Sequence, residues 1–558
     1  MNREWYKDTA FYQIWPRSFK DGNGDGIGDL WGVYEKLEYI QSLGVGGIWF
    51  SPLYVSPNAD FGYDISDYCA INPEYGDLEI FDQVLQKAHT LGLKVVMDLV
   101  INHTSIEHEW FQKSRRGIEP YTNYYIWRAA KPDGGKPNNW QGIFESECWR
   151  WDDVAGKYYL HLFSSGQPDL NMDNPLVRAE VERIMRFWLD RGVDGFREDV
   201  ITFISKTEGL PDDGFVIGLR GMKFYESGPR IHEYLQQYRR ILERYPDRFV
   251  VGEAPMMTPQ KALEFVSGEQ RDLDMMFHFQ HMEADCFLIE YLRMPFNLRK
   301  LKRAFSNWQK ALYGKGWNAL YLENHDHPRV ISRYGSEKYR VESGKMLACA
   351  LLFQQGTPFI YQGQEIGMTN IALPHIEDYA DCVAQDVYKR CKRMHLPDKA
   401  AMALIRPATR DSSRTPVQWS AEQNAGFTEG KPWFYVNQNY PEINVAAAEA
   451  DPDSLLHFYR KLLRFRAGND VIRNGTYREY EKHSGKLYVY TREHRGKGIL
   501  VVCSFTEKPA EFRLPKRLQG KAMTLEFSNY PVPDGPEFTA RPYEARVYTY
   551  ETRKRAKK

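Results

Sequence analysis

The chain has 558 residues, 42% hydrophobic and 14% aromatic, which is too long for one small core and predicts a barrel-sized domain with one or two further modules. Lys and Arg together number 74, as do Asp and Glu, a balance that gives no basic face to suggest nucleic acid and no global field to steer charged partners. Seven scattered cysteines, a charged N-terminus and the lack of an apolar run of about 18 residues favour a soluble, cytoplasmic protein over a secreted or membrane protein.

The first feature along the chain is the glycine-rich loop "DGNGDGIGD" at 21–29, which follows a predicted strand in "AFYQIWPRSF". Its D-x-N-x-D-G pattern matches the first half of an EF-hand loop, where alternating oxygens face a hard cation. The second half does not match, because Gly32 stands where such a loop needs a bidentate Glu. We therefore expect one structural cation site, with a solvated, metal-free loop as the alternative.

Short β-rich runs then alternate with helical ones, which predicts βα units and a parallel sheet. The runs are "VGGIWFSP", "KVVMDLVINH", "GVDGFREDV", "RFVVGEAP", "WNALYLENHD" and "TPFIYQGQE". Before the third run, Asn174, Pro175 and Gly192 mark the start and the end of a predicted helix. Every run ends in polar residues, which would meet on one rim if the sheet closes into an eight-stranded (β/α)8 TIM barrel.

Two segments interrupt this alternation. Residues 104–169 are rich in Trp, Gly, Pro and Asn, and we predict that they form an insertion after strand three. Beyond about residue 478, strand, turn and strand follow one another, which predicts a C-terminal antiparallel β-sandwich domain. The predicted division is therefore a catalytic barrel in two parts (1–103 and 170–478), an inserted domain B (104–169) and a C-terminal β domain (479–558).

Carboxylates recur at the ends of the predicted strands three, four, five and seven, as Asp98, Asp199, Glu253 and Asp326. A lone Asp after a strand is more often a helix cap or a loop hydrogen-bonder. Four on one rim of a barrel favour chemistry, because uncompensated carboxylates repel one another. Hydrolysis of a glycosidic bond uses such a set: one acid protonates the leaving oxygen, and a carboxylate about 5 Å away attacks the anomeric carbon.

Four of these segments, "DLVINH" (98–103), "GFRED" (195–199), "VGEAP" (251–255) and "ENHD" (323–326), resemble in order the four short motifs of the α-amylase family of glycoside hydrolases. The stretches "DFGYDISDY", "QPDLN" and "SRTPVQW" are similar to its oligo-1,6-glucosidase and α-glucosidase branch. This resemblance implies a barrel with an inserted domain and a C-terminal β domain. It also implies one structural Ca²⁺ in the first loop, held by residues matching Asp21, Asn23, Asp25, the Ile27 carbonyl and Asp29.

The resemblance implies Asp199 as the nucleophile, Glu253 as the general acid and base, and Asp326 as a third carboxylate that grips sugar hydroxyls. Residues implied to bind substrate are Asp60, Tyr63, His103, Phe163, Arg197, Val200, His325 and Arg414. Among these, Asp60 and Arg414 resemble a pair that closes the pocket behind the non-reducing glucose, which would make the enzyme exo-acting.

The expected electrostatics differ between the two principal carboxylates. Arg197 lies two residues before Asp199 on the same strand face, so its charge would keep that carboxylate ionised. Glu253 follows "FVV" and precedes Ala-Pro, a less charged neighbourhood that would raise its pKa towards an acid's working range.

Two positions depart from the family pattern. Glu198 stands where relatives usually carry an apolar residue; strand alternation turns it away from Asp199, so we expect a paired carboxylate in the helix layer. His327 replaces the usual glutamine after Asp326, so the resemblance does not imply the contacts of the outer sugar subsite.

Val200 is the residue by which the substrate is predicted, because a valine after the nucleophile marks α-1,6 specificity in this branch. We expect a retaining, exo-acting α-glucosidase that releases terminal α-1,6-linked glucose from short isomalto-oligosaccharides. Alternatives are the same chemistry on trehalose-6-phosphate, sucrose or maltose, transfer to a sugar acceptor, and a non-catalytic member of the family. The expected partner is a small oligosaccharide, without nucleic acid or membrane, and the expected state is a monomer or weak homo-oligomer.

Overall fold

The computed structural model describes residues 4–287, 289–533 and 535–552. Its centre is an eight-stranded parallel sheet in the order β11-β10-β9-β5-β2-β1-β15-β14, and the end strands β11 and β14 contact each other, so the sheet closes into a barrel. The barrel strands are β1 (Phe11–Ile14), β2 (Gly47–Phe50), β5 (Lys94–Leu99), β9 (Gly195–Glu198), β10 (Phe249–Ala254), β11 (Met275–His278), β14 (Ala319–Leu320) and β15 (Thr357–Tyr361).

At least one helix follows each barrel strand, and eight of them continue the βα alternation. These helices are α1 (Leu30–Ser42), α2 (Leu78–Thr90), α4 (Pro175–Arg191), α6 (Ile231–Leu242), α7 (Pro259–Val266), α8 (Leu298–Leu312), α10 (Arg340–Leu352) and α15 (Leu455–Arg466). The predicted helix before β9 is confirmed: the Asn174 side chain accepts a hydrogen bond from Leu176 N–H, and Gly192 ends the helix at a φ of 111°. The predicted TIM barrel is thus confirmed, although β11 was not among the runs expected from sequence.

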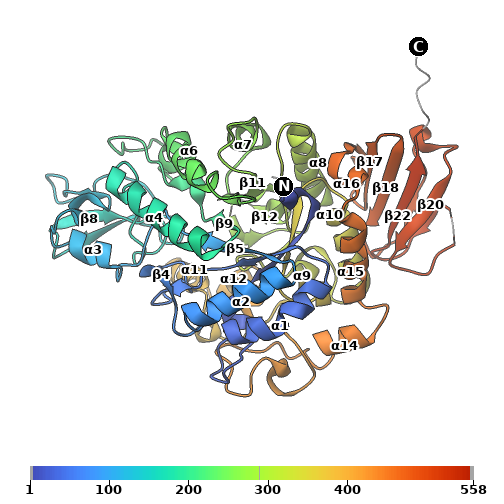
Figure 1. The fold of residues 1–558 in the computed structure, drawn as a ribbon, viewed down its shortest axis with the longest axis horizontal. Coiled ribbons are helices and arrows are strands. Elements are labelled where there is room, and N and C mark those ends of the chain that lie inside the picture. The colour runs from blue at the N-terminus through green and yellow to red at the C-terminus, as the bar shows by residue number, and fades with distance from the viewer. Residues whose placement is uncertain (1–3, 288, 534, 553–558) are drawn as a thin grey trace, which may run out of the picture.

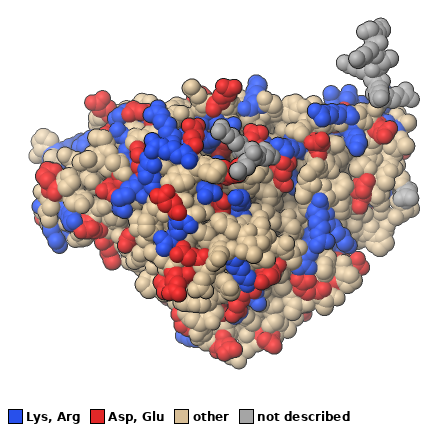
Figure 2. Space-filling model, in the orientation of Figure 1, with Lys and Arg blue, Asp and Glu red and all other residues tan. Residues whose placement is uncertain are grey.

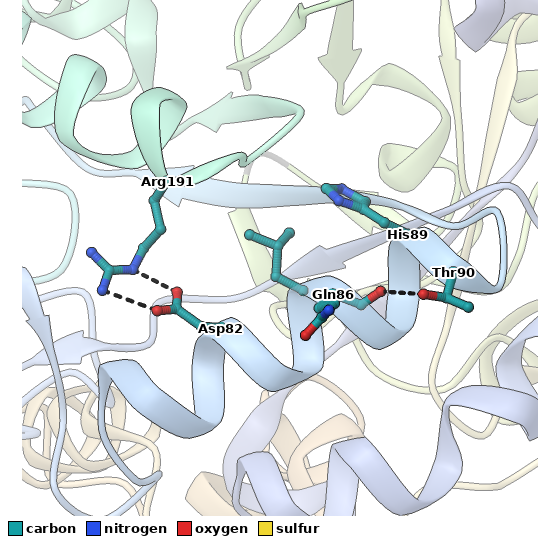
Figure 3. A pocket seen from close by; sticks show the side chains of 6 residues that line it. Asp82, Gln86, His89, Thr90 and Arg191 are labelled. Atoms are coloured by element: carbon teal, nitrogen blue, oxygen red, sulfur yellow. Dashed lines mark hydrogen bonds and ion pairs between the residues drawn. The ribbon is translucent and has the colours of Figure 1, made fainter.

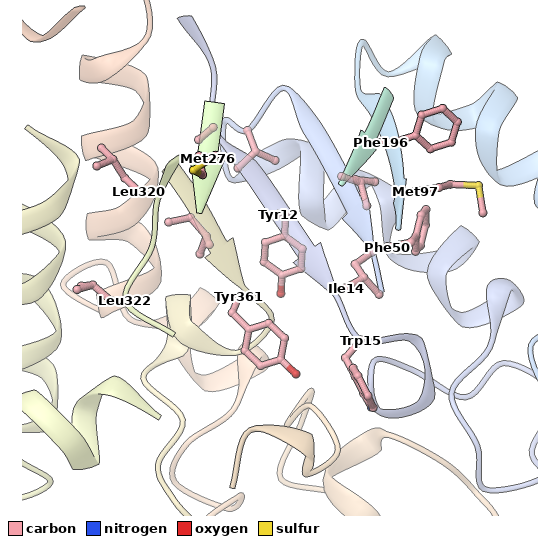
Figure 4. Packing of buried hydrophobic residues seen from close by; sticks show 14 of the residues in the cluster. Tyr12, Ile14, Trp15, Phe50, Met97, Phe196, Met276, Leu320, Leu322 and Tyr361 are labelled. Atoms are coloured by element: carbon pink, nitrogen blue, oxygen red, sulfur yellow. The ribbon is translucent and has the colours of Figure 1, made fainter. Parts of the chain in front are cut away.

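Alternate residues of each barrel strand face opposite sides of the sheet. Phe11, Val96 and Phe277 belong to the cluster that fills the barrel interior. Their neighbours belong to the larger cluster between the strands and the helices, of which Figure 4 shows Tyr12, Ile14, Phe50, Met97, Phe196 and Met276. This alternation decides which strand residues point into the barrel and which point into the helix layer.

The segment predicted as an insertion carries α3 (Glu109–Ser114) and a small sheet of β6 (Trp127–Arg128), β8 (Lys157–Leu160) and β7 (Trp149–Asp152). Smaller elements between barrel units are β3 (Tyr54–Val55), β4 (Asp67–Ile71), α5 (Met222–Tyr225), β12 (Cys286–Phe287), β13 (Ile289–Arg293), α9 (Val330–Tyr334), α11 (Cys382–Arg393), α12 (Asp398–Ile405), α13 (Asp411–Arg414), α14 (Val445–Ala450) and α16 (Asp470–Asn474).

The C-terminal part is an antiparallel β domain, as expected. Its main sheet has the order β16-β17-β18-β22-β20, and β19 pairs with β21 beside it. The bounds are β16 (Thr476–Tyr480), β17 (Leu487–His494), β18 (Lys497–Ser504), β19 (Ala510–Phe512), β20 (Met523–Ser528), β21 (Phe538–Ala540) and β22 (Ala545–Glu551). Figure 1 shows this sheet at one end of the molecule and α3 with β8 at the other.

The surface in Figure 2 carries acidic and basic side chains interspersed, which agrees with the balanced composition. Within the described ranges, every helix is too short or too polar to cross a membrane.

Candidate active site

Four charged side chains meet inside the barrel at the C-terminal ends of three adjacent strands. Asp98 of β5 and Arg197 of β9 are direct partners in the parallel register. Glu253 lies on β10 and Asp199 directly follows β9. All four are at most 6% exposed, so they are held in a low-dielectric interior.

The guanidinium of Arg197 joins the three carboxylates. Its Nη1 donates to Asp199 Oδ1 at 2.6 Å and to Asp98 Oδ1 at 2.8 Å, and its Nη2 donates to Glu253 Oε2 at 2.5 Å. Among the described residues, Asp199 Oδ2 and Glu253 Oε1 have no hydrogen-bond partner. Each principal carboxylate therefore keeps one oxygen available for a ligand.

Three buried carboxylates around one cation carry excess negative charge. Burial raises the pKa of Asp199 well above its ordinary value; Arg197 lowers it, while Glu253 and Asp98 raise it further. Burial likewise raises the pKa of Asp98 to about 6. Arg197 does contact Asp199 as expected, but burial outweighs it. The expected weakly charged surroundings of Glu253 are wrong, because Glu253 shares the same guanidinium.

Asp326 lies in a different environment, beside His325 and Tyr63. His325 Nε2 is 2.9 Å from Asp326 Oδ2 and 2.7 Å from the Tyr63 hydroxyl, and the His325 and Tyr63 rings stack at 5.3 Å. Burial raises the pKa of Asp326, but His325, Arg410 and Arg414 outweigh it and hold that pKa well below its ordinary range. Asp326 is thus held ionised. Burial lowers the pKa of His325 to about 4, so this ring is neutral near pH 7.

His103 and Phe163 form the neighbouring wall. His103 Nε2 lies 3.2 Å from the Tyr63 carbonyl oxygen and 3.2 Å from Gln167 Nε2. The His103 and Phe163 rings are 5.1 Å apart. The structure therefore brings His103, Phe163 and Tyr63 together as predicted neighbours of the carboxylates.

The structure gives Asp60 a different arginine from the predicted one. Asp60 Oδ1 is 3.4 Å from Arg410 Nη2, and its Oδ2 accepts from Gln167 Nε2 at 3.2 Å. Arg414 instead donates to Asp326 Oδ1 at 3.0 Å and to the His325 carbonyl at 3.0 Å. Arg410 and Arg414 stand four residues apart, on either side of a turn of α13, and they contact different carboxylates.

Val200 has a strained backbone. Its φ is 36° and its ψ is 41°, in the left-handed region that β-branched residues rarely adopt. In this conformation its N–H donates to Glu253 Oε2 at 3.2 Å. Its side chain packs with Phe163 and Phe203 in one apolar cluster. Strain is retained only where the surroundings enforce it, and here it fixes the position of a candidate catalytic carboxylate.

The expectation that Glu198 is a paired carboxylate is wrong. The side chain does point away from the barrel interior, but its buried Oε2 has no hydrogen-bond partner. Burial and the nearby Asp272 raise the pKa of Glu198 to about 8, although Arg239 lowers it. Glu198 is therefore a buried, neutral carboxylic acid near pH 7.

The loop at 21–29 is held by hydrogen bonds from its own backbone N–H groups to its carboxylates. Asp21 accepts from the N–H groups of Asn23, Gly24 and Gly26, and Asp29 accepts from Gly22, Asn23 and Gly32. Among the described residues, no group of three or more His, Cys, Asp or Glu side chains converges as metal ligands. Two buried carboxylates nevertheless lie close together, since Asp21 adds to the burial that raises the pKa of Asp29. Their oxygen donors suit a hard cation in chemistry and charge.

A surface hollow of about 550 Å³ lies away from this site, between α2 and the end of α4 (Figure 3). Arg191 and Asp82 pair across one side of it. On the other side His89 contacts Asp194, which precedes β9. The hollow therefore borders the N-terminal rim of the barrel, opposite the carboxylates, where side chains serve stability in this type of barrel.

Several residues at the site carried no signal in the sequence. Gln13 donates to His325 Nδ1 at 2.7 Å, and Gln167 reaches both His103 and Asp60. The buried Asp381 holds Arg410 through contacts of 2.9 and 2.8 Å. A match of "QPDLN" to the family motif marked the segment of Gln167, but not the role of its side chain.

Comparison with known proteins finds relatives that match nearly the whole chain. A family model described as "Alpha amylase, catalytic domain" matches residues 13–475, and one for "Maltogenic Amylase, C-terminal domain" matches residues 477–547. An oligo-1,6-glucosidase of Parageobacillus thermoglucosidasius is 48% identical over 98% of this chain and 99% of its own. The crystal structure of Bacillus licheniformis trehalose-6-phosphate hydrolase superposes with a TM-score of 0.93 at 43% identity, covering 98% of this chain and all of that one. A trehalulose synthase of Pseudomonas mesoacidophila superposes with a TM-score of 0.92 at 38% identity, covering 98% and 99%.

Proposed function

Because the chain belongs to the α-amylase family of glycoside hydrolases, we propose that it is a retaining, exo-acting α-glucosidase that releases terminal α-1,6-linked glucose from isomaltose and short isomalto-oligosaccharides. The observation that carries this proposal is the Arg197 guanidinium, which binds Asp199 through one terminal nitrogen and Glu253 through the other. The two carboxylates are thereby held close together on adjacent strands, as a double displacement requires.

In the first step, Asp199 reacts in its ionised form, which Arg197 favours, and its free Oδ2 attacks the anomeric carbon. Glu253 reacts in its acid form and gives its proton to the glycosidic oxygen, so the second sugar leaves. Arg197 and the Val200 N–H hold Glu253 Oε2, so Oε1 is the atom that faces the leaving group. In the second step, Glu253 takes a proton from water, which attacks the glucosyl ester and restores Asp199. Asp326, ionised beside neutral His325, accepts hydrogen bonds from sugar hydroxyls throughout.

The purified protein should be incubated separately with isomaltose, maltose, sucrose and trehalose-6-phosphate, and the products identified. Retention is read from the anomer of glucose first released, which is expected to be α. Faster cleavage of trehalose-6-phosphate than of isomaltose would overturn the substrate assignment, and release of β-glucose would overturn the mechanism.

Val200 is expected to bias the enzyme towards α-1,6 bonds. Its apolar side chain offers the second sugar of maltose no hydrogen bond and occupies space which that sugar would need. We expect isomaltose to have the higher kcat/KM by about tenfold to two-hundredfold, the range typical of one change in a pocket wall. Val200→Thr keeps the shape and adds a hydroxyl, so it should narrow the gap mainly by improving maltose.

Val200→Ala separates the two contributions, because it removes bulk without adding a hydrogen bond: a gap that narrows in Val200→Ala as well would assign the bias to the bulk of the side chain. If the ratio of kcat/KM for isomaltose to kcat/KM for maltose were the same in the wild type and in Val200→Thr, Val200 would not set the specificity.

We also propose that the loop at 21–29 binds one Ca²⁺ through oxygens of Asp21, Asn23, Asp25, the Ile27 carbonyl and Asp29. The ion would supply charge neutralisation to buried Asp21 and Asp29, and it would bind the folded state alone. Removal of the ion by EDTA should therefore lower the melting temperature, and added calcium should restore it.

Metal content measured by plasma spectrometry shows whether chelation succeeded. A variant at the exposed ligand Asp25 is a second test of the calcium site. Asp25→Asn should reduce the calcium-dependent rise in melting temperature, and it leaves the barrel interior unchanged. Equal melting temperatures for metal-free and calcium-loaded protein would favour the metal-free loop.

A further inference from the structure

The hairpin of β12 and β13 follows barrel strand β11 and precedes α8, in a region that the sequence did not mark as structured. Its strands pair antiparallel with an irregular register. Two consecutive residues of β13, Glu290 and Tyr291, contact two different parts of the candidate active site.

Glu290 fixes the residue that follows Asp326. Its Oε1 lies 2.9 Å from His327 Nδ1 and 2.9 Å from Arg293 Nη2. The His327 ring is 3% exposed and packs edge-on against Phe279 at 5.1 Å. Since His327 and Asp326 are joined by one peptide bond, restraining this ring restrains the backbone that presents the third carboxylate.

Tyr291 fixes the arginine that joins Asp60 to Asp326. Its hydroxyl donates to Asp381 Oδ2 at 3.1 Å. Asp381 is fully buried and accepts from Arg410 Nε at 2.9 Å. Arg410 then reaches Asp326 Oδ1 and Asp60 Oδ1, each at 3.4 Å.

The distances show how Arg410 is shared. The contacts to Asp381 are short, whereas those to Asp60 and Asp326 are near the limit of a hydrogen bond. Because Asp381 binds the Arg410 guanidinium firmly, the oxygens of Asp60 and Asp326 stay accessible to sugar hydroxyls. If Asp381 held it less firmly, Arg410 would move onto those two carboxylates and compete with the sugar.

We propose that the β12–β13 hairpin is a positioning element of the active site, in which Tyr291 acts through Asp381 and Arg410, and Glu290 acts through His327, to keep Asp326 and Asp60 ready for the glucose that is cleaved off. The inference rests on the proposed glucosidase function. It assigns the hairpin to the glucose-binding side of the reaction and not to the leaving sugar.

Tyr291→Phe and Glu290→Gln test this inference with two substrates, isomaltose and p-nitrophenyl α-glucoside, which share the glucose and differ in the leaving group. Each variant is expected to lose about threefold to thirtyfold in kcat/KM on both substrates alike, the range typical of residues that act through others. Inhibition by free glucose should weaken in parallel, because glucose occupies the same site.

Leu292→Ala is the matched control, since Leu292 lies on the same strand and is 38% exposed. It should change neither the kinetics nor the glucose inhibition. A double-mutant cycle of Tyr291→Phe with Asp381→Asn should be non-additive, because both changes act on Arg410.

Losses confined to isomaltose would place the hairpin at the leaving sugar and overturn the inference. A lowered melting temperature with unchanged kinetics would also overturn it and leave the hairpin a purely structural role. Activity of the wild type on both substrates is established first, so failure of the proposed function would be seen separately from failure of this inference.

Discussion

Asp199→Asn is expected to abolish turnover of every glucoside substrate, with a loss on the order of 10⁴-fold in kcat. An amide oxygen is a poor nucleophile, and it cannot form the glucosyl ester on which the double displacement depends. The fold should remain intact. Because burial raises the pKa of the Asp199 carboxyl and because Glu253 and Asp98 repel its charge, the neutral Asn should not lower the melting temperature.

Glu253→Gln is compared with Asp199→Asn, because it should affect the second step of the reaction more than the first. Aryl glucosides with acidic phenols need no proton for departure, so the first step should survive, whereas hydrolysis of the ester loses its base. The glucosyl-enzyme should then accumulate and be detectable by mass spectrometry of the intact protein, with the added mass on a peptide containing Asp199. A variant Asp199→Asn that kept a tenth of the wild-type rate, or a label on another residue, would show that the nucleophile is misassigned.

Local patterns sufficed to predict the barrel and the strand-end carboxylates. Each depends on a short run of apolar residues followed by polar ones, and strand parity then places Asp98, Arg197 and Glu253 on the inner face. Strand β11 was missed because its four residues, "MMFH", contain no β-branched side chain. The β12–β13 hairpin was missed because its strands are short and irregular.

Partners that depend on long-range geometry could not be predicted. The sequence offers Arg410 and Arg414 equally to Asp60, and their contacts are decided by a turn of α13 and by Asp381, which lies 29 residues before Arg410. Gln13 and Gln167 reach the site from distant segments, and a single glutamine carries no pattern. The surroundings of Glu253 were misjudged for the same reason, since Arg197 comes from another strand.

Of the two positions that depart from the family pattern, Glu198 has the larger expected effect on stability. It occupies an outward position of β9 between Arg197 and Asp199, and it is 1% exposed. Its Oε2 lacks a partner, and the neighbouring acids Asp272 and Asp274 oppose its ionisation. Such a group is tolerated as the neutral acid and is destabilising once ionised.

The sign of the pH dependence follows from the two pKa values. In the unfolded chain a Glu carboxyl titrates at about 4.3, whereas burial raises the pKa of folded Glu198 to about 8. Between these values the folded state keeps a proton that the unfolded state has released. The free energy of unfolding therefore falls by about 1.4 kcal/mol for each pH unit as the pH rises through this window, and it levels off above about pH 8.

Glu198→Met removes this penalty, because methionine has a similar length, is apolar and fills irregular space. The variant should melt at nearly the same temperature as the wild type near pH 5 and several degrees higher at pH 8.5, with the difference growing steadily between. Scanning fluorimetry across pH 5 to 9 measures it directly, and Glu35→Met, the same change at an exposed position of α1, is the control. A difference that stays constant across this range would mean that Glu198 does not titrate within it, and that its carboxyl is ionised in the folded protein.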